Sequence, residues 1–379
     1  MTNRLILSIL LSLPIFLFPQ SETTEKGNFD IEKIEKINHF FDSLNLKYKA
    51  SYIEKEIKRI QKQNKFNGVV FVARNNHVFY HDAHGFANYK TKQKLDTNSI
   101  FELASVSKQF TAIAILKLYE EGKLDLKDSV QKFIPCFPYK KRTVHHLLCH
   151  RTGLPDYFKF SHGVWPNKDS LMRNDDLIDI LCKKKYRAQF WVNTKHKYSN
   201  TGYVVLASIV EAVSGQKFNE YLDENFFKPL KMNSTFAGEA PENLKKRLTN
   251  GHAKWYGLRE KSFMDGCLGD KGVWSTTHDL NIWSNAVFSG QIISDSLLHL
   301  ATTPKNPDMI AEYNYGYGYR LGKIYDNQNL VFHGGLWGGF NTLFIRRLQD
   351  KINIIVLSNL DNKSFRQQSG KWIEIIEQL

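Results

Sequence analysis

Ser105 and Lys108 are the residues whose types and spacing are best suited to catalysis. Apolar residues recur at helical spacing behind them and Gly122 ends the pattern, which predicts an amphipathic helix beginning near Ser105. Residues three apart share one face of a helix, so the hydroxyl and the amine would lie side by side. The positive end of a helix dipole and apolar neighbours both favour a neutral lysine. Such a lysine can take the serine proton while N–H groups at the helix start hold an oxyanion, so the pair predicts acyl transfer through a serine ester.

The Ser-x-x-Lys spacing alone has a plainer interpretation. It recurs at Ser129 with Lys132 and at Ser214 with Lys217. Such a serine is commonly a helix N-cap, and the lysine is then a solvated surface residue. The rest of the sequence must decide between these two interpretations.

A second polar group, Tyr198-Ser199-Asn200, precedes a helical pattern at 201–213. A tyrosine near a lysine can share its proton and act as base or acid for the serine. An asparagine side chain offers both a donor and an acceptor to a substrate amide. The plainer interpretation is a turn, because Tyr-x-Asn also occurs at 325–327.

A third group, His333-Gly334-Gly335, ends a predicted strand at 330–333 and is followed by Leu336. Glycines at a strand edge let a substrate backbone lie close and pair with it, and an N–H group there can complete an oxyanion hole. The alternative is a hydrogen-bonded structural histidine.

Composition sets the broad class. The 379 residues are 42% hydrophobic and 13% aromatic, enough for one large domain or two lobes. The net charge is +14, but acidic residues lie between the basic ones, so nucleic-acid binding is not expected. The four cysteines, Cys136, Cys149, Cys182 and Cys267, are too widely spaced for a small disulfide scaffold. Buried free thiols are expected, although the sequence leaves their pairing open.

The N-terminal sequence predicts export. Arg4 is followed by an apolar run, residues 5–18, that Pro14 interrupts and that is too short to span a bilayer comfortably. Residues 1–20 are therefore expected to be a signal peptide, and the protein to be periplasmic or extracellular without needing membrane association. An uncleaved N-terminal anchor is the alternative. A lipoprotein anchor is not favoured, because no cysteine follows the run.

The remaining pattern predicts an α+β fold. A helical accessory segment at 21–50 precedes a domain at 51–379, which opens with a helix and a β-hairpin at 66–87. Helical patterns and loops fill a block at about 123–251. Late strands and a closing helix are expected at 315–321, 330–333, 341–347, 352–359 and 365–379. Strands at both ends imply one sheet built from both ends of the chain, with a mostly helical lobe beside it and the catalytic residues in the cleft between.

The chain resembles the class C β-lactamase-like serine hydrolases, which include D-alanyl-D-alanine carboxypeptidases, low-molecular-weight penicillin-binding proteins and esterases. The likeness extends from about residue 67 to residue 359 and includes the segments KPLKMNSTF and GVWSTTHDL. It implies an antiparallel sheet flanked by helices, with a mostly helical second lobe. Three motifs carry it in a fixed chain order: Ser105-Val106-Ser107-Lys108, Tyr198-Ser199-Asn200 and His333-Gly334-Gly335.

By this resemblance Ser105 is the nucleophile, and Lys108 with Tyr198 is the proton-transfer pair. The backbone N–H groups of Ser105 and Leu336 would form the oxyanion hole. Asn200 would orient the substrate.

The resemblance also places His333, Gly334 and Gly335 on the opposite wall of the substrate site, but this motif departs from the family pattern. True β-lactamases of this type carry Lys-Thr-Gly there. A lysine offers a fixed cation to a substrate carboxylate, whereas histidine is mostly neutral near pH 7. Strong recognition of a β-lactam or D-alanine carboxylate, and efficient antibiotic hydrolysis, are therefore not predicted.

A rival site is the cluster of His145, His146, Cys149 and His150, whose spacing suits zinc. No His-Glu-x-x-His pattern or distant carboxylate supports a metal, and the resemblance makes this segment a support for the serine. No metal and no cofactor are predicted.

The sequence thus predicts an exported serine hydrolase that forms an acyl-enzyme at Ser105. Its substrate would be a peptide, amide or ester of the cell envelope, as in a D-alanine carboxypeptidase or an esterase. The alternative is a catalytically silent, penicillin-binding-type sensor that keeps the fold and binds a ligand.

Overall fold

The computed structural model describes residues 48, 50–59, 62, 66–74, 77–310, 313–324 and 328–361. The chain divides into two compact units, Met1–Asn45 and Leu46–Leu379, and every described residue belongs to the second. The expected signal peptide at 1–20, most of the accessory segment at 21–50 and the closing helix at 365–379 lie outside the described residues.

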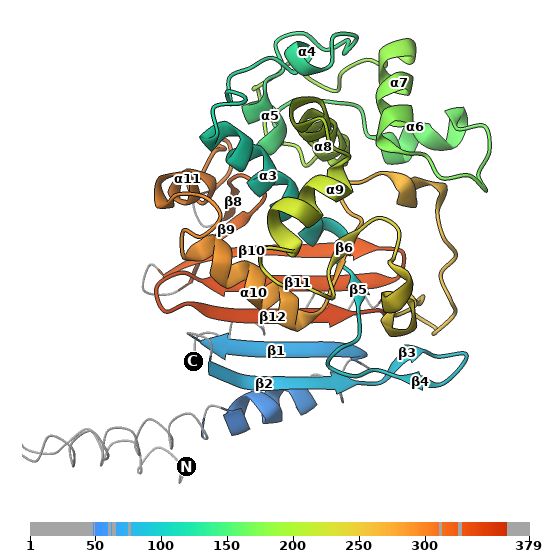
Figure 1. Cartoon of the computed structure of the whole chain (residues 1–379), viewed down its shortest axis with the longest axis vertical. Coiled ribbons are helices and arrows are strands. Elements are labelled where there is room, and N and C mark those ends of the chain that lie inside the picture. Colours follow the sequence, from blue (N-terminus) through green and yellow to red (C-terminus); the bar gives the residue numbers. More distant parts are fainter. Residues whose placement is uncertain are drawn as a thin grey trace, which may run out of the picture. The chain divides into compact units, whose positions relative to one another are not determined.

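A seven-stranded antiparallel sheet forms the centre of the second unit (Figure 1), in the order β2-β1-β12-β11-β10-β9-β8. Strands from both ends of the chain meet in it, since Gly68 of β1 pairs with Ser358 of β12. The predicted α+β fold with one sheet built from both ends is therefore confirmed. The strand bounds are β1 Gly68–Arg74, β2 His77–His84, β8 Tyr313–Tyr315, β9 Arg320–Ile324, β10 Gln328–Trp337, β11 Phe340–Arg347 and β12 Ile352–Ser358.

Both faces of this sheet are apolar, because successive side chains of a strand point to opposite sides. In β12 every residue is buried. Ile354 packs with Ile53 and Ile57 of the helical stretch at residues 50–59, whereas Ile355 belongs to the main core. The sheet is thus covered on one face by this N-terminal helix and on the other by the large core.

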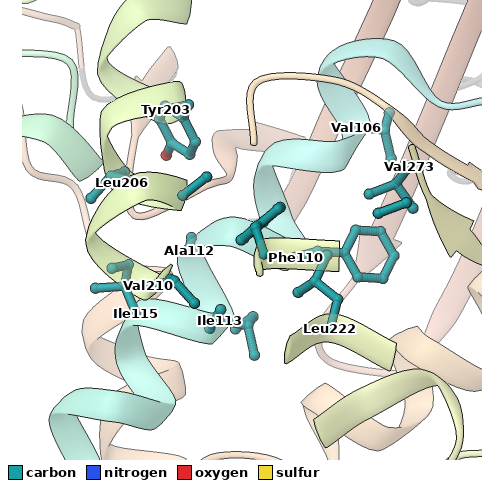
Figure 2. Packing of buried hydrophobic residues seen from close by; sticks show 14 of the residues in the cluster. Val106, Phe110, Ala112, Ile113, Ile115, Tyr203, Leu206, Val210, Leu222 and Val273 are labelled. Atoms are coloured by element: carbon teal, nitrogen blue, oxygen red, sulfur yellow. The ribbon is translucent and has the colours of Figure 1, made fainter. Parts of the chain in front are cut away.

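The helix that carries Lys108 is buried far more completely than the sequence suggested. The helix α3 (Lys108–Glu120) is buried at every position from Lys108 to Leu116, so it is not amphipathic over its first turns. The helix α8 (Asn200–Ser214) packs against it through residues such as Leu206 and Val210, as Figure 2 shows. Gly215 ends α8 in the left-handed conformation, which glycine commonly adopts at the end of a helix.

Most expected helices are present, with shifted ends. The 3-10 turn η1 (Ala104–Ser107) precedes α3. The remaining helices are α4 Val130–Phe133, α5 Val144–Leu148, α6 Tyr157–Val164, α7 Asn174–Lys184, α9 Phe218–Leu222, η2 Asp223–Phe227, η3 Glu242–Arg247, η4 Phe263–Gly266, α10 Thr277–Phe288 and α11 Asp295–Ala301. None of the helices in the described part of the chain is both long enough and apolar enough to cross a membrane.

Two small sheets complete the fold. The strands β3 (Phe86–Asn88) and β4 (Gln93–Lys94) pair with each other. In the other, β7 (Val273–Ser275) lies between β5 (Phe101–Glu102) and β6 (Phe236–Ala237). The β5–β7 pairing brings the segment near residue 273 beside the start of η1.

The strand expected at 315–321 is two strands, because glycine breaks it. The strand β8 ends at Tyr315 and β9 begins at Arg320. Gly318 between them has φ of +79°, and a Cβ at Gly316 would overlap the carbonyl oxygen of Ala301. The chain therefore turns sharply over α11 before it re-enters the sheet.

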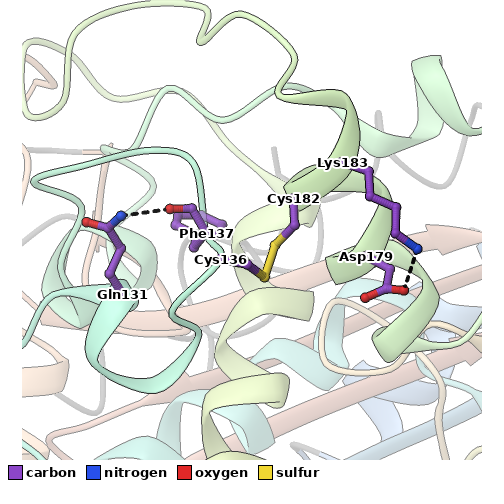
Figure 3. Close-up of a disulfide and its surroundings, with 6 residues drawn as sticks. All are labelled: Gln131, Cys136, Phe137, Asp179, Cys182 and Lys183. Atoms are coloured by element: carbon purple, nitrogen blue, oxygen red, sulfur yellow. Dashed lines mark hydrogen bonds and ion pairs between the residues drawn. A yellow bond between two sulfur atoms is a disulfide. The ribbon is translucent and has the colours of Figure 1, made fainter.

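The cysteines differ from the expectation of free thiols. Cys136, which follows α4, forms a disulfide with Cys182 of α7 (Figure 3). Cys149 and Cys267 are buried and unpaired, as expected. The segment after α4 and the helix α7 are therefore joined covalently.

Candidate active site

Ser105 lies on the 3-10 turn η1, one step before the α-helix rather than in its first turn. The preceding residue, Ala104, has φ of +50°, a left-handed conformation that costs an alanine about 1–2 kcal/mol. A Cβ at Gly335 of β10 would lie 2.8 Å from the Ala104 Cβ and would overlap the Leu103 carbonyl oxygen. Close packing of β10 on η1 therefore holds this strained turn, and only glycine fits at residue 335.

Lys108 is fully buried, which excludes the interpretation of a solvated surface lysine. Its Nζ lies 3.1 Å from Ser105 Oγ, 2.8 Å from Asn200 Oδ1 and 2.6 Å from the backbone carbonyl oxygen of Asp270. Three contacts from three separate segments fix the amine beside the serine hydroxyl.

Burial makes this amine a usable base. Loss of solvent is the main cause that lowers the pKa of Lys108 to about 7, and the cations of Lys271 and Arg320 act in the same direction. Asp270 and Glu102 oppose them. A substantial fraction of Lys108 is therefore neutral near pH 7, with a lone pair available for the proton of Ser105.

Tyr198 lies over the same amine, with its ring centre 4.9 Å from Lys108 Nζ. Its hydroxyl makes no hydrogen bond of ordinary geometry with the described residues, although it lies near enough to Ser105 for that hydroxyl to lower its pKa. Burial outweighs this contact and raises the pKa of Tyr198 far above its usual value. Tyr198 is therefore a neutral phenol, suited to passing a proton on rather than to acting as the first base.

The Tyr-Ser-Asn segment is placed by the start of α8. Ser199 caps this helix by accepting a hydrogen bond from the Gly202 amide at 3.1 Å. Asn200, the first helical residue, uses Oδ1 to accept from Lys108. Among the described residues the hydrogen bond found for this side chain uses Oδ1, so its amide nitrogen can donate to a substrate carbonyl.

His333 lies on β10 near the site, but its ring is fully buried. Its Nδ1 donates to the Gly334 carbonyl oxygen at 2.8 Å, and its Nε2 accepts from the Tyr315 hydroxyl at 3.1 Å. Burial lowers the pKa of His333 well below its usual value, so the ring is neutral. With both ring nitrogens occupied, His333 is suited to positioning β10 rather than to contacting a substrate.

The edge of β10 beyond His333 is open. The strand β9 pairs with β10 only as far as Phe332. Gly334 and Leu336 are exposed there, while Gly335 is buried against η1. A substrate backbone can therefore lie along this edge beside Ser105, with the Leu336 N–H group on the strand and the Ser105 N–H group on the turn.

A hollow continues from the end of β10. Leu336, Trp337 and the two following glycines line one side of it. The indole of Trp337 stacks on Phe158 with ring centres 4.8 Å apart and donates from Nε1 to Asp265 at 2.7 Å. The other lining residues are Arg259, Glu260, Ser262, Asp265 and Asp361.

The histidine-rich cluster does not converge on one point. His145 Nδ1 lies 2.6 Å from the Tyr317 hydroxyl, and His146 caps α5 by bonding back to Thr143. His150 instead supports the candidate site, because its ring lies 4.3 Å from the Tyr198 ring and its Nδ1 accepts from the Ser199 amide at 3.1 Å. No metal-binding group of three or more acidic, histidine or cysteine side chains is found among the described residues.

Sequence reasoning missed three residues of the site: His150, Asp270 and Arg320. His150 stood in a segment assigned only a general supporting role. Asp270 precedes the segment GVWSTTHDL, and nothing near it in the sequence indicates that its backbone oxygen reaches Lys108, 162 residues away. The Arg320 guanidinium lies 5.3 Å from the Tyr198 ring centre, but no local pattern separates this arginine from others.

Fold and site together define a serine hydrolase of the penicillin-binding type. The sequence matches the family described as Beta-lactamase over residues 53–375, so the chain belongs to this family. The resemblance found in the three motifs is thereby confirmed.

Individual relatives agree. Penicillin-binding protein 4* of Bacillus subtilis (strain 168) is 32% identical over 335 residues, which are 85% of this chain and 74% of that protein. Protein flp of Staphylococcus aureus (strain N315) is 26% identical over 309 residues, 78% of this chain but only 59% of that relative. Among solved structures, the octameric penicillin-binding protein homologue from Pyrococcus abyssi has a TM-score of 0.70 and 27% identity, with 82% of this chain and 73% of that chain covered.

Proposed function

We propose that the protein hydrolyses an amide or ester bond through an acyl-enzyme on Ser105, with Lys108 as the base. The observation that carries this is the buried Lys108 amine, 3.1 Å from Ser105 Oγ, at a pKa of about 7. As Ser105 Oγ attacks the carbonyl carbon, its proton passes to Lys108 Nζ. The N–H groups of Ser105 and Leu336 hold the oxyanion.

The same groups act in the later steps of the reaction. Tyr198, whose ring lies 4.9 Å from Lys108 Nζ, passes the proton from Lys108 to the leaving amine or alcohol as the carbonyl–leaving-group bond breaks. Water then attacks the acyl-enzyme carbonyl and gives a proton to the same pair. As the bond between the carbonyl carbon and Ser105 Oγ breaks, the pair returns that proton to Oγ and the acid is released. Asn200 orients the acyl group through its free amide nitrogen.

The substrate we infer is a small peptide, amide or ester of the cell envelope, for which a cell-wall peptide is the leading candidate. The open edge of β10 suits a peptide backbone, and the relatives named for penicillin binding favour the same class. Export is part of this proposal. The apolar run at residues 5–18 and the Cys136–Cys182 disulfide both fit an oxidising compartment outside the cytoplasm.

The direct test is covalent labelling by a fluorescent fluorophosphonate, with a fluorescent penicillin as second probe. The wild type should be labelled, and Ser105→Ala should lose labelling while keeping the same unfolding midpoint. Mass spectrometry of the labelled protein should place the adduct on Ser105. Ser129, which also precedes a lysine by three residues, provides a matched control, since Ser129→Ala should be labelled normally.

A substrate comparison completes the test. Turnover of a D-alanyl-D-alanine peptide and of a p-nitrophenyl ester should be measured side by side, and both should vanish in Ser105→Ala. A folded wild type that resists both probes and turns over neither substrate would contradict the proposal and favour a silent, ligand-binding protein.

A further inference from the structure

A tightly held loop, residues 267–272, lies behind the catalytic amine and between the helices α3 and α8. Thr111 of α3 donates to the Gly269 carbonyl oxygen at 2.7 Å. A Cβ at Gly269 would lie 2.5 Å from the Tyr203 carbonyl oxygen and 2.7 Å from the Ala207 Cβ, both on α8. Gly269 also has φ of +107°, which a side chain would strain. Position and conformation of this loop are therefore fixed by close contact with both helices.

The loop carries a buried ion pair. Asp270 and Lys271 are 1% and 3% exposed, and Lys271 Nζ lies 3.6 Å from Asp270 Oδ1. The Tyr157 hydroxyl joins them, donating to Asp270 Oδ2 at 2.9 Å and accepting from Lys271 Nζ at 2.8 Å. The Trp337 ring covers the same ammonium, with its centre 5.1 Å away. A carboxylate, a cation and a phenol thus form one closed unit inside the protein.

This unit touches the catalytic amine through the backbone. The Asp270 carbonyl oxygen accepts the shortest of the three hydrogen bonds of Lys108, at 2.6 Å. The side-chain charges act on the same amine in opposite senses. The Asp270 carboxylate favours the ammonium and raises the pKa of Lys108, whereas the Lys271 cation lowers it.

A buried ion pair is an unfavourable way to fill a protein core, because both charges lose their hydration. Removing two charges from water costs several kcal/mol per ion unless geometry and extra hydrogen bonds compensate. Here Asp270 Oδ1 makes no hydrogen bond within the described residues, so compensation is incomplete. Apolar residues of similar size would often fill such a space at equal or better stability. A stabilising role alone therefore does not account for charges at this place.

We propose that Asp270 and Lys271, joined by Tyr157, are positioning residues that hold Lys108 against Ser105 and set how much of it is neutral at working pH. The inference rests on the proposed function only in that Lys108 is the base. Asp270 fixes the amine through its carbonyl oxygen, and the two opposite side-chain charges balance each other at that amine. The two charges thereby keep Lys108 partly neutral, so that it can take the serine proton, and still basic enough to hold that proton until it is passed on.

Other groups face Lys108 as well, and the loop variants replace none of them. Glu102 lies on β5, and burial raises its pKa to about 8, so it is mostly uncharged at neutral pH. Arg320 is the remaining nearby cation. The neutral groups around the amine are Ser105, Tyr198, Asn200, Tyr203, His150 and His333.

The test is the acid limb of the pH profile of kcat/KM, which reports deprotonation of the base in the free enzyme. The wild-type midpoint should lie near pH 7, the pKa of Lys108. Asp270→Asn keeps the carbonyl and the acceptor for Tyr157 but removes the negative charge, so the midpoint should fall by about one pH unit. Lys271→Met removes the opposing cation, so the midpoint should rise by about the same amount.

Tyr157→Phe is the matched control, because it removes one hydroxyl and leaves both charges. It should lower kcat without moving the midpoint. Lys271→Met leaves Asp270 buried without its cation, and this variant can fail to fold. The double variant, Asp270→Asn with Lys271→Met, therefore provides a second test without an unpaired buried charge. In that double variant the two effects cancel, and the midpoint should return toward the wild-type value.

A measurement without substrate separates this inference from the proposed function. In Ser105→Ala protein, 15N NMR of the lysine Nζ should show one titration near pH 7 that Lys108→Met abolishes and that the loop variants shift in the same opposite directions. If these shifts occur but the wild type hydrolyses neither test substrate, the proposed function fails and the positioning role stands. Equal losses of kcat with an unmoved midpoint, or shifts of both single variants in one direction, overturn the positioning role.

Discussion

At the scale of single residues, the third motif lacks a cation, but Arg320 of the neighbouring strand lies near the candidate catalytic groups. His333 of this motif is buried and neutral, and both of its ring nitrogens are hydrogen-bonded. Arg320 of β9 pairs in register with Phe332, the residue before His333. Its guanidinium lies 5.3 Å from the Tyr198 ring centre and forms no hydrogen bond or ion pair with any described residue. A half-buried cation without an anion, beside the reacting groups, is suited to a substrate carboxylate.

This argument predicts which substrates depend on Arg320. A peptide that ends in a free carboxylate should be compared with the same peptide ending in an amide, at a pH above the acid limb. Arg320→Gln should lower kcat/KM for the carboxylate peptide about 10–100-fold, as expected for a lost hydrogen bond between charged groups. The amide peptide should lose much less, so the ratio between the two substrates collapses.

Arg320→Lys is the matched variant, since it keeps the charge but loses the planar fork. It should retain part of the preference. If Arg320→Gln lowers both substrates equally, Arg320 acts on Lys108 or Tyr198 alone and the carboxylate site is wrong.

At the scale of elements, local sequence patterns predicted which helices and strands exist. They predicted less well how deeply each element is buried and with which other elements it pairs. The pattern at 201–213 predicted α8 to within a residue at each end. The helix behind Ser105 was expected to be amphipathic, yet α3 is buried all round its first turns because α8 packs against it and Phe110 stacks on Trp283 of α10. The strand expected to end at His333 continues to Trp337, because β11 pairs with it through both glycines. Burial and pairing of this kind depend on partners far along the chain, which periodicity does not reveal.

The contact between β10 and η1 gives a prediction with an internal control. Gly335→Ala places a Cβ 2.8 Å from the Ala104 Cβ and into the Leu103 carbonyl oxygen, so β10 or the Ser105 turn must move. At Gly334, next in the chain, a Cβ would meet nothing closer than the Thr342 carbonyl oxygen at 3.6 Å. Fluorophosphonate labelling should slow at least about 100-fold in Gly335→Ala, since small misplacements in an active site cost rates of this order.

Gly334→Ala should be labelled at close to the wild-type rate, and far-ultraviolet circular dichroism should show both variants folded. Equal labelling of the two variants would mean that β10 does not set the geometry of the Ser105 turn.

At the scale of the whole molecule, residues from distant parts of the chain assemble one polar centre. Lys108 receives its partners from residues 92 and 162 positions away, Asn200 and Asp270. The motifs predicted the first of these, since Asn200 of Tyr198-Ser199-Asn200 was expected to orient the substrate at the serine. The second partner is a backbone oxygen, which any residue type supplies, so no sequence pattern marks it. The same limit applied to the cysteines, because their spacing is equally compatible with free thiols and with a pair.

The Cys136–Cys182 disulfide closes a stretch of 46 residues within the helical lobe, and this predicts its effect on stability. A cross-link of this length restricts the unfolded chain and contributes about 2–4 kcal/mol. Cys136→Ser with Cys182→Ser should therefore unfold at lower urea concentration, and wild type in dithiothreitol should match it. Cys149→Ala and Cys267→Ala, made at the buried free thiols, should respond to dithiothreitol as wild type does.

Since the link joins α7 to the segment after α4 and touches none of the catalytic groups, fluorophosphonate labelling of the double variant should persist below its unfolding transition. A wild type whose urea midpoint ignores dithiothreitol would show that the two cysteines are not joined in solution.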